Sequence, residues 1–249
     1  PLIRSLFLPE SGCKWGCFDY SQQEPRLVVH YASLDQDTSA FGVKDSYLNE
    51  NADFHTVVAK MADIPREQAK TINLGLFYGM GKAKLQAELG VSKEKAEELF
   101  SIYHSRVPFV KNLMNSVSNR AQQRGQIRTL LGRLCRFPLW EPNQFGMHKA
   151  LPFEQAVQEH GPGIKRAYTY KALNKLIQGS AADMTKKSML DLYKEGIVAH
   201  IQIHDELDLS VDSDKKTKKI VEIMENAVKL EVPNKVDYES GDNWGDIYD

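Results

Sequence analysis

Polar and apolar residues alternate in one short segment near the end of the chain, within Ile197–Val211. From Leu207 to Val211 the alternation has a period of two, which is typical of a strand with one buried face. An apolar run precedes it, so the segment predicts a β-hairpin with His204, Asp205 and Glu206 at its tip. The tip is either a rigid metal-binding turn or an ordinary acidic turn, because Asp is a common turn former.

The other periodic segments predict a strand, several helices and a second hairpin. A buried strand is expected at 14–20, and a small hairpin at 125–138 with Gly132 in its turn. Helices are expected at 21–34, 53–61, 66–78, 92–104, 108–124, 165–194 and 214–230. Residues 35–52 are expected to form loop with short helical turns, 138–163 to be irregular, and the tail from Val236 to add an edge strand. This order predicts an α+β fold with a helical insertion between two parts of a sheet.

Composition narrows the class of protein. The 249 residues are 42% hydrophobic and 26% charged, which is ordinary for a globular chain of one large or two small domains. The three cysteines lack zinc-site spacing and suggest a reducing compartment. No apolar run approaches 18 residues and no signal peptide is present, so we expect no membrane partner. Because the sequence starts with Pro1, we expect a fragment or processed product.

The net charge of −1 conceals an uneven distribution. Between Lys60 and Arg136 there are fourteen Lys and Arg against six Asp and Glu, whereas acids outnumber bases by about two to one after Asp205. Phosphate contacts need local positive charge, so this distribution is compatible with nucleic-acid binding.

Two acidic residues at strand ends are candidates for metal binding. Asp19 ends the first strand and Asp205 lies at the hairpin tip. If the two strands are neighbours, their carboxylates converge and repel, and a pair of Mg²⁺ ions would remove that repulsion and organise phosphoryl transfer. The alternative is two unrelated surface acids.

Two helices carry polar stripes. Arg66, Lys70, Leu74 and Tyr78 follow one another at i+4 steps, an arrangement that suits a triphosphate followed by a base, with His55 as a further phosphate donor. The alternative is a solvated cationic face with a core tyrosine. On the long helix, the pair formed by Asn174 and Gln178 either reads a nucleic-acid duplex or is an amide pair on a packed helix.

Five ordered segments resemble family A, polymerase I-like, DNA polymerases. The segment 19–26 (DYSQQEPR) resembles motif A, 66–79 (RxxxKxxxLGxxYG) resembles motif B, and 204–206 (HDE) resembles motif C. Segments 174–183 and 125–133 resemble further parts of the family. The short link from His55 to Arg66 resembles the phage T7-type branch more than bacterial polymerase I.

The resemblance implies a role for each matched residue. Asp19 and Asp205 would hold two Mg²⁺ ions, with Mn²⁺ as a possible substitute, and Glu206 would support them. Glu24 would exclude a 2′-hydroxyl and bond to Tyr78. The incoming dNTP would contact Gln22, Glu24, His55, Arg66, Lys70, Leu74 and Tyr78, and Lys70 is also a candidate general acid. Primer–template DNA would contact Asn174, Gln178 and His204.

The resemblance also implies a right-hand architecture with a palm at 1–33 and 164–249 and fingers at 34–163. The thumb and any exonuclease domain, fused or separate, are expected upstream of Pro1. Leu74 departs from the family's usual Phe or Tyr, which puts sugar discrimination and catalytic rate in doubt. Gln23 and Pro25 replace usually apolar residues, which suggests different local packing.

The expected activity is template-directed addition of dNTPs to a primer 3′ end by two-metal-ion nucleotidyl transfer. A single-subunit RNA polymerase is a rival, against which the Glu24 carboxylate argues. A non-catalytic nucleic-acid-binding remnant is another, against which the intact Asp19, Asp205, Arg66 and Lys70 argue. The expected location is the cytoplasm of a bacterium or phage-infected cell, or else an organelle.

Overall fold

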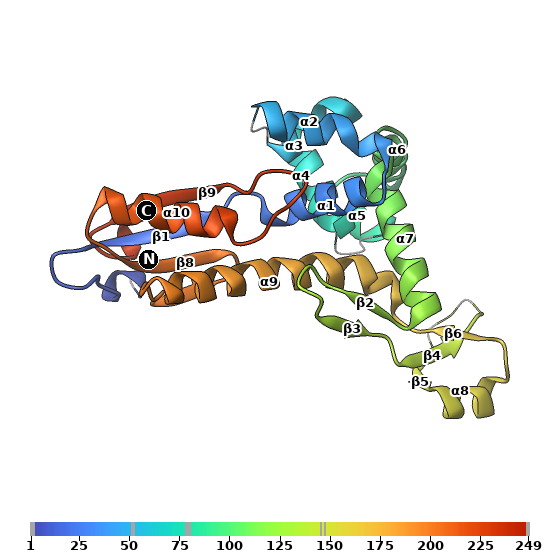
Figure 1. Ribbon diagram of the computed structural model, residues 1–249. Helices are drawn as coiled ribbons and strands as arrows, with labels where there is room; N and C mark the ends of the chain where they lie inside the picture. Colours follow the sequence, from blue (N-terminus) through green and yellow to red (C-terminus); the bar gives the residue numbers. More distant parts are fainter. Residues whose placement is uncertain (1–2, 51–52, 78–80, 145, 147, 248–249) are drawn as a thin grey trace. The chain divides into compact units, whose positions relative to one another are not determined.

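The computed structural model describes residues 3–50, 53–77, 81–144, 146 and 148–247 (Figure 1). Its internal contacts divide the chain into two compact units, one formed by residues 1–30 and 180–249 and the other by residues 31–179. These boundaries differ from the expected limits of palm and fingers. The largest difference is where the chain returns to the first unit, which is after Gly179 and not after residue 163. Each unit is described by itself.

The first unit is built on an antiparallel sheet with strand order β7-β8-β1-β9. The strands are β1 (Lys14–Tyr20), β7 (Ile201–Ile203), β8 (Glu206–Val211) and β9 (Val236–Gly241). The predicted first strand, the hairpin and the edge strand are therefore confirmed. The pairing joins the N-terminal strand directly to the hairpin, although about 190 residues separate them in sequence.

Helices α9 (Ala172–Lys194) and α10 (Asp214–Asn226) contact one face of this sheet. Phe18 packs against Tyr238, with ring centroids 4.7 Å apart. The Tyr20 hydroxyl lies 2.6 Å from Ser188 Oγ in α9 and donates to the Met224 carbonyl oxygen in α10. Figure 1 shows α10 alongside the strands of the sheet. This buried hydroxyl ties both helices to the strand that carries Asp19.

Helices dominate the second unit. After α1 (Gln23–Leu34), which begins in the first unit, come α2 (Phe41–Glu50), α3 (Phe54–Ala62), α4 (Arg66–Phe77), α5 (Lys82–Leu89), α6 (Lys93–Arg106) and α7 (Pro108–Arg124). Two predicted starts are confirmed by capping, since Asp53 accepts from the Thr56 N–H and Ser92 from the Lys95 N–H. The hairpin of β2 (Gln126–Arg128) and β3 (Leu134–Arg136) is also confirmed.

Three predictions in this unit were wrong. Residues 35–52 contain a ten-residue helix, α2, in which Val43 and Tyr47 are the only buried side chains among those that the structure describes, so its periodicity is weak. Residues 138–163 are not irregular: β4 (Leu139–Pro142), β5 (Leu151–Pro152) and β6 (Ile164–Arg166) form a sheet beside α8 (Phe153–His160). The long helix begins at Ala172 rather than Lys165, because residues 164–166 pair with β4.

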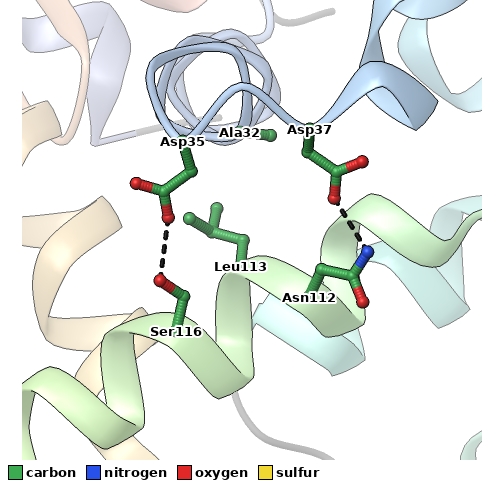
Figure 2. Close-up of a pocket in the computed structure, with 6 residues that line it drawn as sticks. All are labelled: Ala32, Asp35, Asp37, Asn112, Leu113 and Ser116. Carbon is green, nitrogen blue, oxygen red and sulfur yellow. Dashed lines mark hydrogen bonds between the residues drawn. The ribbon is translucent and has the colours of Figure 1, made fainter.

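The end of α1 is joined to α7 by polar contacts around a shallow pocket (Figure 2). Asn112 Nδ2 donates to Asp37 Oδ2 at 2.9 Å, and Ser116 Oγ donates to Asp35 Oδ2 at 2.9 Å. Arg120 also donates to the same Asp35 oxygen at 2.5 Å. Both carboxylates already accept hydrogen bonds from α7, so the pocket is best explained as part of the packing between the end of α1 and α7.

Candidate active site: a carboxylate cluster and a cationic helix

The pairing of β1 with β8 brings the two candidate metal ligands together. Asp19 lies opposite Glu206 in the antiparallel register, and the Tyr20 N–H donates to the Asp205 carbonyl oxygen at 3.3 Å. Residues directly opposite in such a pair have Cβ atoms about 4.5–5.5 Å apart. The expected neighbourhood of the two strands is therefore confirmed, and metal binding by Asp19 and Asp205 stays a prediction.

A two-residue turn presents Asp205. His204 adopts a left-handed conformation with φ of 51°, and its carbonyl oxygen accepts a hydrogen bond of 2.7 Å from Gln202 Nε2. A left-handed residue is characteristic of tight hairpin turns, which hold side chains in a defined direction. The His204 side chain is exposed, whereas Asp205 and Glu206 are half-buried.

The electrostatic environment of these carboxyls disfavours joint ionisation. Burial, followed by the negative charges of Asp205, Glu206, Asp237 and Glu239, raises the pKa of Asp19 to about 7. Burial also raises the pKa of Asp205 above its ordinary value. A bound cation would offset this repulsion, because it favours the ionised form of its ligands.

The sequence analysis did not identify two of the acids whose negative charge raises the pKa of Asp19. Asp237 and Glu239 lie on β9, where Asp237 is paired with Asp19 and Glu239 with Cys17. The sequence predicted an edge strand in the tail from Val236, but only the register shows which of its acids lie next to Asp19. Carboxylate oxygens are hard ligands of the kind that Mg²⁺ prefers, so the chemical type of these side chains fits that ion.

The cationic stripe lies on the outer face of α4. Arg66 and Lys70 are exposed and Leu74 is half-buried, while Ala69 and Ile72 turn into the core. Arg66 Nε lies 2.8 Å from Asp53 Oδ2, and this carboxylate raises the pKa of the guanidinium. The predicted helix is confirmed; Tyr78, the last member of the stripe, lies outside the described residues.

His55 lies inside the helical unit. Its side chain is 7% exposed, and its Nδ1 lies 3.0 Å from Asn73 Nδ2, while Tyr103 donates to Asn73 Oδ1. Burial is the largest cause of a lowered pKa for His55, which favours the neutral ring. Asn73 thus links α3, α4 and α6, a role that the sequence analysis did not predict.

The turn after β1 combines exposed and buried polar residues. Gln22 has a φ of 56°, and both Gln22 and Glu24 are half-buried. Gln23, one of the departures from motif A, is 4% exposed, and its Nε2 donates to Thr185 Oγ1 at 3.3 Å. The adjacent Arg26 is 1% exposed and donates to the carbonyl oxygens of Ser21 and Pro233 at 2.8 and 2.6 Å.

The amide pair on α9 is partly accessible. Asn174 is half-buried and Gln178 is exposed. Next to them, Arg133 Nη2 donates to the Gly179 carbonyl oxygen at 2.7 Å, which attaches the β2–β3 hairpin to the helix. The amides therefore lie beside an ordered cationic hairpin.

Within the described part of the chain, no helix is long and apolar enough to cross a bilayer.

Comparison with known proteins identifies the family. The family model for DNA polymerase family A matches residues 2–246. A DNA-directed DNA polymerase of Pseudomonas phage M6 is 36% identical over 97% of this chain and 40% of its own length, and DNA polymerase I of Bacillus caldotenax is 33% identical over 98% and 27%. The higher identity to the phage protein agrees with the predicted likeness to phage enzymes.

A solved structure matches over nearly the whole chain. It is the POL domain of Pol1 from M. smegmatis in complex with DNA primer-template and dNTP, with a TM-score of 0.78 and 27% identity over 99% of this chain and 43% of that one. The chain thus spans less than half the length of each relative named here. With the family model matching residues 2–246, and with the similarity of sequence and fold to these relatives, the chain belongs to DNA polymerase family A.

Proposed function

We propose that this chain is the catalytic portion of a template-directed DNA polymerase, which adds dNTPs to the 3′ end of a primer. One observation carries the proposal: Asp19 lies at the end of β1, and Asp205 lies in the turn that leads into its paired strand β8, in a member of a family named for this activity. Residues 1–33 and 164–249 would form the palm, and residues 34–163 would form the fingers.

Asp19 and Asp205 are proposed to hold two Mg²⁺ ions, with Mn²⁺ as an alternative, and Glu206 to support them. Bound Mg²⁺ would supply Lewis acidity and neutralise charge on the phosphates during transfer. The protein's own contribution is positional: the β1–β8 register aligns the carboxylates before substrate arrives. Because burial and neighbouring acids raise the pKa of Asp19 to about 7, its carboxyl is mostly in the ionised, cation-binding form above neutral pH.

The dNTP is proposed to contact α4 and the motif A turn. Arg66 and Lys70 would hold the triphosphate, and Lys70 would donate a proton to the departing pyrophosphate. Leu74 and Tyr78 would contact the sugar and base, and Gln22 and Glu24 would also contact the nucleotide. His55 would act on the phosphates through its second ring nitrogen, since Nδ1 faces Asn73.

Primer–template DNA is proposed to contact Asn174, Gln178 and His204, whose exposed or half-buried side chains offer hydrogen bonds to sugars and base edges. The thumb is proposed to belong to an upstream portion, either fused or on a separate polypeptide. The relatives' greater length supports this partner.

The decisive experiment joins the chain to its upstream portion and measures extension of a labelled primer with Mg²⁺ and dNTPs. We expect extension by the parent protein and loss of at least about 10³-fold in Asp205→Ala, because phosphoryl transfer depends on the metal-held geometry. Asp45→Ala is a matched control, since this acid is exposed on α2. Extension retained by Asp205→Ala would refute the metal assignment, and DNA binding without any extension by the parent would favour a non-catalytic remnant.

A second experiment tests the cationic stripe. Lys70→Ala is expected to lower kcat by about 10²-fold, in the range of lost general acid catalysis, and to raise KM for dNTP. Lys84→Ala on α5 is the control, because Lys84 is an exposed lysine of the same unit. Equal effects of the two changes would contradict a specific role for Lys70.

Sugar selection tests the proposed role of Glu24. Glu24→Ala is expected to increase incorporation of rNTPs relative to dNTPs, because it removes the carboxylate that would oppose a 2′-hydroxyl. Parent protein that prefers rNTPs would instead favour the RNA polymerase reading.

A further inference from the structure

One face of the first unit's sheet carries a second group of metal-ligand side chains. Cys17 and Asp208 are direct partners in the β1–β8 register, and Glu206 lies two residues from Asp208 on the same strand. Side chains two apart on a strand point to the same face. The pairing therefore brings one thiol and two carboxylates together on the face opposite α10.

Asp208 is buried without a hydrogen-bond partner. Its exposed fraction is 0%, and neither carboxylate oxygen has a partner among the residues that the structure describes. Burial raises the pKa of Asp208 to about 6, and the nearby Cys17 thiol and Trp15 indole offset part of that rise without reaching hydrogen-bond geometry. A buried carboxylate that makes no hydrogen bond is costly, and such groups occur where a cation completes their coordination.

Cys17 and Glu206 complete the group around Asp208. One ligand atom from each of the three residues lies within 4.8 Å of the other two. Cys17 is 3% exposed, is a free cysteine, and packs with Trp15 and Trp244 in an apolar cluster. Glu206 is only half-buried, so it provides access from the edge of the site.

We propose that Cys17, Glu206 and Asp208 form a binding site for a thiophilic divalent cation such as Zn²⁺. Zn²⁺ accepts thiolate and carboxylate ligands together, and a set of three protein ligands leaves a fourth position for water. Mg²⁺ does not favour thiolate, so the ligand set separates this site from the candidate site at Asp19 and Asp205. The site shares Glu206 with the candidate catalytic cluster.

The test titrates the chain with Co²⁺ in the presence of excess Mg²⁺ and without oxygen. Co²⁺ reports thiolate ligation by a charge-transfer absorption band in the near ultraviolet. We expect this band at one equivalent, its loss on adding Zn²⁺, and its absence in Cys17→Ala. Asp208→Asn, which keeps the side-chain shape, is expected to weaken Co²⁺ binding about tenfold or more.

The other cysteines provide matched controls. Cys13→Ala and Cys135→Ala are expected to keep the band, because neither residue lies in the group of three. Urea unfolding of each variant checks that it folds. If Cys17→Ala does not fold, the result for Asp208→Asn decides the test. The proposal is overturned if the parent shows no thiolate band, if the band survives in Cys17→Ala, or if Asp208→Asn binds Co²⁺ as tightly as the parent.

Discussion

The raised pKa of Asp19 makes a prediction about stability. In the unfolded chain this carboxyl has an ordinary pKa of 3.8, and in the folded protein about 7. Folding therefore favours its protonated form, so the cost of ionisation is absent below about pH 4, grows as the pH rises, and is complete above pH 7. Asp19→Asn removes this cost while retaining the shape of the side chain.

The size of the effect follows from the shift. A rise from 3.8 to about 7 corresponds to about 4 kcal/mol at 1.36 kcal/mol for each pKa unit. Asp19 is only half-buried, so screening by water reduces this ceiling, and we expect about 1–2 kcal/mol. Asp19→Asn should thus raise the free energy of unfolding by that amount at pH 8 and leave it nearly unchanged near pH 4.

The assay is urea unfolding of the metal-free chain, with EDTA present, at pH 4 and pH 8. Asp45→Asn serves as the control, because it removes an exposed carboxyl and should change stability little at either pH. Added Mg²⁺ at pH 8 should stabilise the parent more than Asp19→Asn. A variant that is no more stable than the parent at pH 8 would refute the reasoning, as would equal stabilisation of both by Mg²⁺.

Three further substitutions test the packing around the site. Tyr20→Phe should lower the free energy of unfolding by about 1–3 kcal/mol in urea, since the buried hydroxyl that bonds Ser188 is lost; no loss would contradict this. Gly179→Ala should cost about 1–3 kcal/mol, since a Cβ there would lie 2.7 Å from Thr129 Cγ2; an unchanged thermal midpoint would argue that the hairpin can move aside. Asn73→Ala should cost about 2 kcal/mol and raise the pKa of the histidine it contacts, as measured by NMR titration, because the buried ring loses its partner; an unchanged histidine pKa would show that burial alone controls it.

Elements with strong local signals were predictable. The α4 helix follows from its apolar period and from Pro65 ahead of its first turn, and the caps at Asp53 and Ser92 follow from residue chemistry alone. The hairpin around His204 and Asp205 followed from an apolar run before a polar turn and from alternation after it. In each case the deciding interactions lie within a few residues of one another in the chain.

Elements held by distant partners were not predictable. Strands β4, β5 and β6 are two to four residues long, and they exist because they pair with one another. Helix α5, which buries only Leu85, and helix α2 have little amphipathic character. Pairing with β4 also sets the start of α9, since residues 164–166 would otherwise extend a helical pattern.

The candidate site also has features that the sequence predicts and features that depend on tertiary contacts. The sequence by itself determined the type and order of the motif residues, and the local elements that carry Asp19, Asp205 and the α4 stripe. Only the tertiary structure decided that Asp19 lies opposite Glu206, that β9 adds Asp237 and Glu239 to its field, and that Asp208 is buried beside Cys17. The physical reason is that strand register and burial arise from contacts between segments far apart in the chain, which no local pattern encodes.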